Sequence, residues 1–285
     1  MNLAAHPAPD AVPGLGTTEF REVAEILRAE ARISLGEAKI NLVQSRLARR
    51  LRESGLTDFS AYLRLVRKDD AERARMVTAL TTNHTLFFRE NHHFDHLRAE
   101  VMPELKARAG AGQPVRLWSA GCSSGEEVYS MAMVLAGTSR ADAHWLRGDV
   151  RLLATDLSLP MVEAVGRARY PALGADQIPL PYRAAWLHNE GAEVAIDPAL
   201  RALVTARGLN LFAPWPFAGQ FDVIFCRNVM IYFDADARAE LEQRLVAQLR
   251  PGGTLYIGHS ERLSSAAAAA TTCCGQTIYQ KPKAA

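Results

Sequence analysis

The sequence has little cysteine, almost no net charge and no long apolar run, and each shortage excludes a class of protein. Four of its 285 residues are cysteine, two of them the neighbours Cys273 and Cys274, and no pair has the C-x-x-C spacing. A disulfide scaffold or zinc ribbon is therefore not expected, and a reducing cytoplasm fits best. Lysine and arginine number 33 against 31 aspartates and glutamates, a net charge of +2 that does not indicate a nucleic-acid partner. No stretch reaches the length of a membrane span, and a signal-peptide pattern is not found at the amino terminus.

What the chain does have is a change of pattern near residue 83. Residues 1–16 are rich in proline, alanine and glycine, and are predicted to be a disordered lead-in. Residues 17–82 show helical periodicity with cap residues, which predicts a small all-helical N-terminal domain. Residues 83–112 are predicted to form a linker and a connecting helix.

From residue 113 to residue 285, short apolar runs alternate with helical stretches. The runs "VRLWSA", "VRLLATD", "FDVIFCRN" and "GTLYIGHS" are typical of buried strands. This alternation predicts an α/β domain with a doubly wound, mostly parallel, Rossmann-like sheet. Prolines punctuate short alternating pieces between residues 170 and 208, so an inserted antiparallel β-subdomain is expected there.

The string "AGCSSGEE" places Gly121 and Gly125 at a strand-to-helix turn, where a ligand can approach the backbone closely. A nucleotide triphosphate is excluded because Glu126 stands where a P-loop has lysine, and two carboxylates would repel phosphates. The spacing also departs from the dinucleotide pattern G-x-G-x-x-G, although the topology is compatible. The remaining common ligand of such sheets is S-adenosylmethionine, whose positive sulfonium suits nearby carboxylates. Asp156, at the end of the next strand, would accept the ribose hydroxyls, cap the following helix, or do both.

Five longer strings carry a family resemblance: "TTNHTLFFRENHHF", "RLWSAGCSSGEEVYSMAM", "ATDLS", "FDVIFCRNVMIYF" and "LRPGGTLYIGHSE". In this order they resemble the CheR family of chemotaxis receptor methyltransferases, over residues 17–281. The resemblance implies a helical domain followed by an S-adenosylmethionine-binding methyltransferase domain with a small β-subdomain. The implied enzyme is a protein-glutamate O-methyltransferase that forms methyl esters on chemoreceptor helices and releases S-adenosylhomocysteine. Ser124 stands where the family usually has threonine, and the hydroxyl is kept.

The implied chemistry needs few catalytic groups. A glutamate nucleophile is already ionised at neutral pH, so no general base is required, and the sequence shows no convincing Ser-His-Asp or Cys-His arrangement. A cation must orient the incoming carboxylate; the resemblance assigns this role to Arg89 and places Tyr232 beside the transferable methyl. By themselves, Arg89 could be a surface arginine paired with Glu90, and Tyr232 could be an aromatic that closes the core. Together with the glycine turn, the resemblance implies this set of cofactor-binding residues: Asn83, Thr85, Arg89, Gly121, Glu127, Asp156, Asn210, Leu211, Arg227 and Asn228.

Several other residues that could suggest a functional site are expected to have only structural roles. His92, His93 and His96 have a spacing that could bind zinc, but they lack a convincing acidic or cysteine partner, so no metal is expected. Cys122 and Cys226 are expected to be small buried residues. Two alternatives to the main hypothesis stay open: a methyltransferase of the same fold with another substrate, and a non-catalytic module that senses the cofactor or docks to receptors. An aromatic content of 7% argues against a nucleic-acid substrate.

The segment 39–52 contains five basic residues and no acidic one. Arg46, Arg49 and Arg50 are predicted to lie opposite its apolar stripe and to dock on the receptor's helical bundle; a solvated basic face is the alternative. The string "HNEGAE" leaves a short turn in the β-subdomain, so a tether to a receptor tail peptide is not expected. The protein is expected to act as a cytoplasmic monomer that is recruited to receptor arrays without inserting into the membrane.

Overall fold

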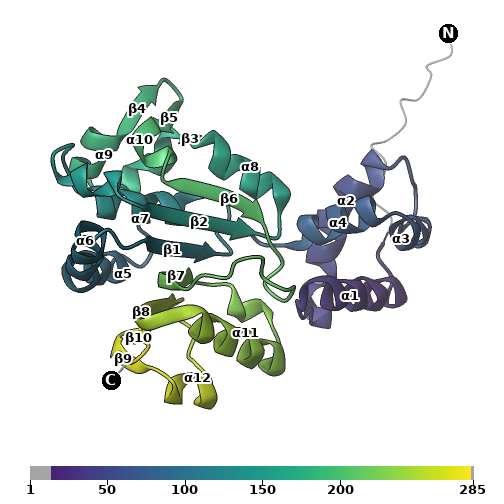
Figure 1. Ribbon diagram of the computed structural model, residues 1–285. Coiled ribbons are helices and arrows are strands. Elements are labelled where there is room, and N and C mark those ends of the chain that lie inside the picture. Colours follow the sequence, from purple (N-terminus) through teal and green to yellow (C-terminus); the bar gives the residue numbers. More distant parts are fainter. Residues whose placement is uncertain (1–13, 284–285) are drawn as a thin grey trace, which may run out of the picture. The chain divides into compact units, whose positions relative to one another are not determined.

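The computed structural model describes residues 14–283, which form two compact units (Figure 1). The first unit ends at Thr82 and the second begins at Asn83, where the sequence pattern changes. Most of the predicted lead-in, residues 1–16, lies outside the described residues. Within the described part of the chain, no helix combines the length and apolarity needed to cross a bilayer.

The first unit is helical, as its periodicity predicts. Its α-helices are α1 (Thr17–Ala31), α2 (Ile40–Glu53), α3 (Phe59–Lys68) and α4 (Asp70–Leu80), with a 3-10 turn η1 (Glu37–Lys39) before α2. Asp58 and Asp69 accept hydrogen bonds from backbone N–H groups at the starts of α3 and α4, and so cap both helices. The apolar stripes of the helices meet in one core, which includes Val23, Leu27, Leu47, Tyr62, Val66 and Met76.

The second unit is built on a seven-stranded sheet with the order β6-β2-β1-β7-β8-β10-β9. Its strands are β1 (Val115–Ala120), β2 (Val150–Asp156), β6 (Val204–Gly208), β7 (Phe221–Cys226), β8 (Leu249–Ile257), β9 (Thr272–Gly275) and β10 (Ile278–Gln280). The strands from β6 to β8 are parallel, and β10 pairs antiparallel with β8 and β9. The predicted doubly wound, mostly parallel sheet is therefore confirmed. The strand order reverses between β1 and β7, and ligands of such sheets bind at the carboxyl ends of the strands beside this reversal.

Helices cover both faces of the sheet (Figure 1). The main ones are α7 (Glu126–Ala136), α8 (Leu159–Arg167) and α11 (Ala235–Gln248). Because crossovers between parallel strands are right-handed, α7 and α8 lie on one face and α11 on the other. The shorter helical segments are α5 (His92–His96), η2 (Leu97–Val101), α6 (Met102–Gly110), η3 (Asp142–Arg147), η5 (Met230–Tyr232) and α12 (Ser265–Ala269).

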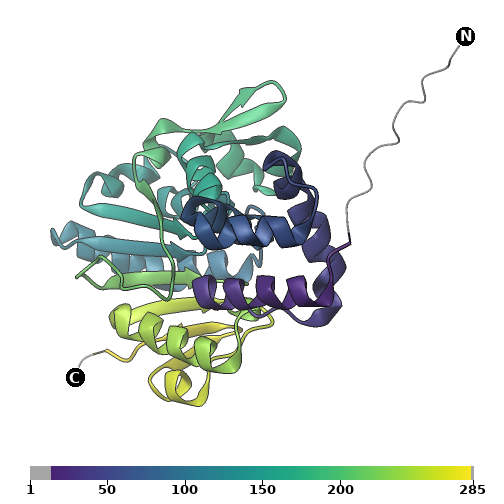
Figure 2. The ribbon, with the colours of Figure 1, turned by 90° about the vertical axis from the view of Figure 1, so that its right-hand side faces the viewer.

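A small antiparallel sheet is inserted after α8. Its order is β3-β5-β4, formed by β3 (Arg169–Pro171), β4 (Leu187–Glu190) and β5 (Glu193–Ile196), together with η4 (Ala172–Gln177), α9 (Leu180–Trp186) and α10 (Pro198–Arg201). The β4–β5 hairpin stands at the margin of the second unit in Figures 1 and 2. The segment β6, which the sequence analysis places at the end of the insertion, belongs instead to the main sheet, where it pairs parallel with β2.

Candidate active site

The turn between β1 and α7 requires glycine at two positions. Gly121 has a φ of 78° and Gly125 a φ of 103°, in a region that residues with a Cβ rarely adopt. A Cβ at Gly121 would lie 2.5 Å from Val229 Cγ2, and one at Gly125 would lie 2.8 Å from the Tyr170 hydroxyl. The backbone of this turn therefore packs closely against neighbouring side chains, and glycine is needed at both positions for that reason.

Asp156 ends β2 and organises the turns around it. The residue is 8% exposed, and its Oδ2 accepts a hydrogen bond from the Ser123 N–H at 2.8 Å. Its Oδ1 accepts another from the Ser158 N–H at 2.9 Å, at the start of α8. Burial raises the pKa of Asp156, while these backbone hydrogen bonds oppose the rise. Asp156 therefore fixes the turn that leads into α8 but does not cap the helix itself, because Ser158 is the N-cap residue and, within the described chain, no side chain caps α8; the carboxylate keeps lone pairs for a role toward ribose hydroxyls.

Glu126 and Glu127, at the start of α7, have different partners. Glu126 Oε2 accepts a hydrogen bond from the Ser124 hydroxyl at 2.7 Å. Glu127 Oε1 accepts one from the Ser119 hydroxyl at 2.7 Å, and its Oε2 lies 3.6 Å from Arg227 Nε. Burial raises the pKa of both carboxyls. Their charged forms are therefore poorly solvated within the protein, and a positive ligand would stabilise them.

Arg89 lies in a turn with unusual backbone angles. Its neighbours Phe88 and Glu90 have φ values of 52° and 58°, each in the left-handed region although neither is glycine. The turn is held by a hydrogen bond from the Phe88 N–H to Ser130 Oγ at 3.0 Å and by one from Arg227 Nη2 to the Arg89 carbonyl. Strained backbone of this kind persists where its surroundings fix it firmly, which is common at functional sites.

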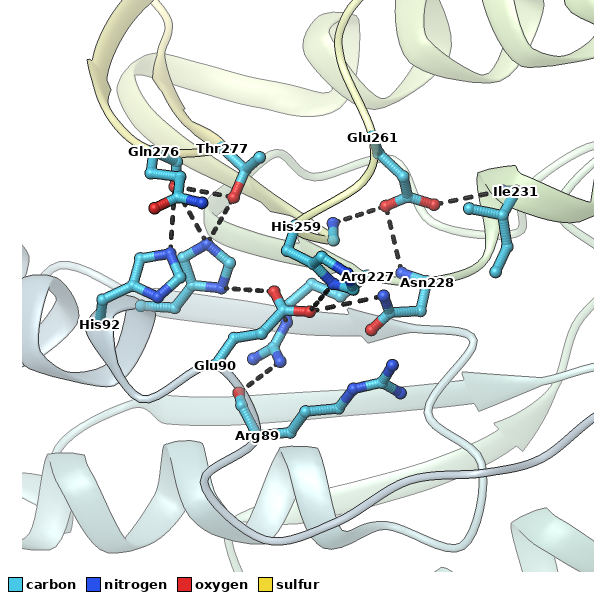
Figure 3. Close-up of polar contacts among 12 residues, drawn as sticks. Arg89, Glu90, His92, Arg227, Asn228, Ile231, His259, Glu261, Gln276 and Thr277 are labelled. Carbon is cyan, nitrogen blue, oxygen red and sulfur yellow. Dashed lines mark hydrogen bonds and ion pairs between the residues drawn. The ribbon is translucent and has the colours of Figure 1, made fainter.

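The Arg89 side chain is partly exposed, and its Nη1 donates to the His84 carbonyl at 3.1 Å. Figure 3 shows its guanidinium pointing away from the Glu90 carboxylate, so the simple surface pair considered for these two residues is not formed. The backbone of Arg89 is thus fixed by the turn, and its guanidinium group is directed toward the site. This arrangement suits a side chain that orients an anion.

Arg227 and Glu90 form the buried support of that turn. Arg227 Nε lies 3.7 Å from Glu90 Oε2, and its guanidinium carbon lies 5.5 Å from the Phe94 ring centroid. Burial lowers the pKa of Arg227, although Glu127 and Glu90 favour its charge. Burial also disfavours the charged form of Glu90, but Arg227 and the His259 hydrogen bond outweigh this and lower the Glu90 pKa. The structure therefore places the buried Arg227 between two largely buried acids, Glu90 and Glu127, next to the Arg89 turn.

The segments that carry the other predicted cofactor residues meet at the glycine turn. The Asn83 carbonyl accepts a hydrogen bond from Ser123 Oγ at 2.8 Å. The Leu209 N–H donates to the Asp156 carbonyl at 2.9 Å, which brings Asn210 and the buried Leu211 beside the end of β2. Thr85 is partly buried, in the segment between Asn83 and the Arg89 turn.

Asn228 and Tyr232 follow β7, at the other side of the strand-order reversal. Asn228 has a φ of 58°, and its N–H donates to the Glu261 carboxylate at 3.1 Å. Tyr232 is partly exposed at the end of η5. Sequence reasoning missed Glu261, which is buried and accepts several backbone hydrogen bonds. The available signal was an acidic residue in "GHSE", directly after an apolar strand.

Four of the histidines and cysteines that the sequence singles out, His93, His96, Cys122 and Cys226, are packed within the second unit. His93 is fully buried and shares a hydrogen bond of 2.9 Å with Thr277 Oγ1. His96 Nδ1 lies 2.8 Å from the Tyr256 hydroxyl. Among residues 14–283, no group of three His, Cys, Asp or Glu side chains is placed to hold a metal ion. Cys122 and Cys226 are buried, and burial raises the pKa of both thiols.

Two of the three arginines on the predicted basic face of α2 have tertiary partners within the helical unit. Arg46 Nη1 donates to the carbonyls of Leu80 and Thr81, at 2.7 and 3.0 Å, and so holds the end of α4. Arg50 Nη2 lies 2.6 Å from the carboxylate of the buried Glu72. Helical periodicity identified the face but not these tertiary partners. Arg49, whose side chain is 81% exposed, remains on the surface and pairs along the helix with Glu53.

Comparison with known proteins gives two family matches along the chain. Residues 18–81 match the CheR methyltransferase all-alpha domain, and residues 83–279 match the CheR methyltransferase SAM binding domain. The chain is 42% identical to a probable chemotaxis protein methyltransferase of Rhizobium etli, over 90% of this chain and 96% of that protein. It is 37% identical to the chemotaxis protein methyltransferase of Escherichia coli, over 94% and 92% of the two chains. A magnesium protoporphyrin IX methyltransferase structure from Synechocystis is similar at 14% identity and a TM-score of 0.37, over 75% of this chain and 83% of that one.

Proposed function

This chain belongs to the CheR family of S-adenosylmethionine-dependent chemotaxis protein methyltransferases, and on that premise we propose that it methylates glutamate side chains on the cytoplasmic helices of chemoreceptors. One observation of the structure supports this proposal most directly. A partly exposed arginine, Arg89, is held in a strained turn within electrostatic reach of the largely buried Glu127 carboxylate, and Asp156 is buried at the end of β2. The site thus offers a cation for an anionic nucleophile and acids for a positive methyl donor.

The residues of the site fit S-adenosylmethionine, which supplies an activated methyl group when bound. The raised pKa values of Glu126 and Glu127 indicate carboxylates that gain from a nearby positive charge. Asp156 would accept the ribose hydroxyls, and the backbone of the turn that contains Gly121 would lie against the ligand. The proposed cofactor-binding set is Asn83, Thr85, Arg89, Gly121, Glu127, Asp156, Asn210, Leu211, Arg227 and Asn228.

Catalysis in this proposal depends on position and not on proton transfer. The substrate glutamate is ionised at neutral pH, so the Arg89 guanidinium only has to orient its carboxylate toward the methyl. Phe87 and Phe88 are buried beside Arg89 and help to keep water away from the reacting atoms. Tyr232 is proposed to lie beside the transferable methyl. The product is a glutamate methyl ester.

The proposed partner is the receptor's cytoplasmic helical bundle, approached by the exposed cation of α2, Arg49. The enzyme is proposed to act as a cytoplasmic monomer recruited to receptor arrays. A tail-peptide tether is not part of the proposal, because only Gly191 and Ala192 connect β4 to β5.

Calorimetry tests the cofactor part of this proposal. We expect S-adenosylhomocysteine to bind with one molecule per chain, and Asp156→Asn to weaken binding about tenfold or more, because a charge-assisted hydrogen-bond acceptor is lost. Asp149→Asn is the matched control, since Asp149 pairs with Arg116 just before β2, at the strand end away from the site. Folded wild-type protein that gives no heat with either cofactor form would contradict the proposal.

A further inference from the structure

Glu261 joins the ends of two central strands through its side chain. The residue follows β8 and is 4% exposed. Its Oε2 accepts hydrogen bonds from the N–H groups of Gly258, at 2.5 Å, and Asn228, at 3.1 Å. Its Oε1 accepts one from the Ile231 N–H at 3.2 Å. Figure 3 shows this carboxylate between the segment after β8 and the segment after β7.

The segment after β7 needs such a support. Asn228 has a φ of 58°, in the left-handed region, which asparagine tolerates better than other residues with a side chain but which its surroundings must still hold. Between the end of β7 and the single turn η5, the backbone belongs to no strand or helix, so regular hydrogen bonding does not fix it. Burial raises the pKa of Glu261, but the backbone N–H donors oppose this rise because they favour the ionised form. Hydrogen bonds to an ionised acceptor are about twice as strong as neutral ones, so this carboxylate can hold the backbone around it.

A second observation shows how tightly this joint is packed. A Cβ on Gly258 would lie 2.6 Å from Asn228 Nδ2, 2.7 Å from Asn228 N and 2.8 Å from Glu261 Oε2. Position 258 therefore has no room for a side chain while the joint is intact. The residues Gly258, Asn228 and Glu261 form one interlocked unit, which we call the anchor.

The anchor also reaches the Arg89 turn. Asn228 Nδ2 donates to Glu90 Oε1 at 3.4 Å, and Glu90 is the residue after Arg89. A shift of the Asn228 backbone would therefore move Tyr232 on one side and loosen the Arg89 turn on the other.

From this geometry we propose that Glu261 is a positioning residue for methyl transfer. Its carboxylate fixes the backbone of residues 228–231 and thereby places Asn228 and Tyr232 at the site. The expected effect on kcat rests on the proposed function, whereas the expected effect on cofactor binding does not. Glu261 acts through the backbone of other residues, because its own carboxylate is buried and occupied by three N–H donors.

The first test is Glu261→Gln, which keeps the side-chain shape but turns one acceptor oxygen into a donor amide. At least one backbone N–H then faces another donor. We expect a folded variant whose Kd for S-adenosylhomocysteine is about tenfold or more higher, and whose kcat at saturating cofactor and receptor fragment is lower by a similar factor. Gly258→Ala should show the same two losses, because it opens the anchor with the carboxylate intact.

Glu242→Gln is the matched control. Glu242 is also a fully buried glutamate, and it accepts a backbone N–H, that of Ser264, outside the anchor. This control should leave the Kd and kcat of the folded protein unchanged, whatever its effect on the melting temperature.

The outcomes separate the hypotheses. Wild-type Kd and kcat in folded Glu261→Gln, or in Gly258→Ala if the first variant does not fold, would overturn the positioning role. Equal losses in Glu242→Gln would also overturn it, since any buried glutamate would then have the same effect. If wild-type protein binds cofactor but methylates no receptor fragment, the proposed function fails, and the Kd comparison still decides the role of Glu261.

Discussion

At the scale of single residues, the site consists of buried charges that hold one partly exposed arginine. Arg227 and Glu90 support the Arg89 turn from below, and Glu261 holds the segment after β7. A charge that is buried and paired can position its neighbours, but it cannot follow an incoming substrate. Burial therefore decides which charges can only position their neighbours and which one, Arg89, can meet the substrate.

The buried His93 ring predicts sensitivity to acid. Burial, together with the nearby charge of Arg227, lowers the pKa of His93 to about 3. In the unfolded chain a histidine binds a proton below about pH 6.5, while the folded protein keeps this ring neutral until about pH 3. Since the unfolded state binds more protons in this window, the contribution of His93 to stability is complete above pH 6.5 and is lost as the pH falls toward 3.

Urea unfolding of wild type and His93→Gln at several pH values measures this effect. Between pH 6.5 and 4.5 we expect the wild type to lose free energy of unfolding more steeply than the variant, by up to about 1.4 kcal/mol per pH unit for one proton. Glutamine cannot gain that proton but can still hydrogen-bond to Thr277. Parallel curves for the two proteins would show that His93 is not the group responsible.

At the scale of elements, helix α2 separates a structural arginine from a surface arginine one residue apart. We expect Arg49→Glu to raise the KM for receptor fragments several-fold at low ionic strength, because it reverses an exposed charge that we propose faces an acidic substrate. Its melting temperature should change little. Arg50→Glu is the contrasting variant: it places a second acid beside buried Glu72 and should cost about 3 kcal/mol of stability or more. An unchanged KM for Arg49→Glu at low salt would show that this basic face is only solvated and does not dock the receptor.

The β4–β5 hairpin is the second element with a testable consequence. Strand β4 lies at the edge of the small sheet, where a peptide strand could pair, but Gly191 and Ala192 provide only a two-residue turn. A turn this short offers little extra backbone to hold a peptide. Titration of the protein with receptor tail peptides should therefore show no micromolar binding. Micromolar affinity that is lost when β4 is altered would contradict this expectation.

At the scale of the whole molecule, the sequence predicts the central sheet well because of how parallel strands are buried. Apart from Asp222, the run "FDVIFC" is apolar on both faces, and every residue of β7 is buried. Strand β6, "VTARG", lies at the sheet edge and is half exposed, so its pattern resembles the neighbouring insertion. The position of β6 in the main sheet depends on its pairing with β2, and the local sequence pattern does not indicate that pairing.

The candidate site shows the same limit. The glycine turn and Asp156 follow from strand ends and backbone geometry, and both could be predicted. The partners of Arg50 and the role of Glu261 could not, because each depends on a contact across 22 or more positions of the chain. Family resemblance names residues at a site but does not show which of them support the others.

The central claim is methyl transfer to receptor glutamates without a general base, and one measurement tests it most directly. Purified protein is incubated with methyl-labelled S-adenosylmethionine and receptor cytoplasmic fragments, and base-labile methyl on the receptor is counted. We predict that the wild type transfers base-labile methyl groups to glutamates. Arg89→Ala should fold and turn over about a hundredfold more slowly or worse, because the cation that orients the nucleophile is gone. Label that is stable to base, no transfer by cofactor-binding wild type, or near-normal turnover by Arg89→Ala would contradict the account.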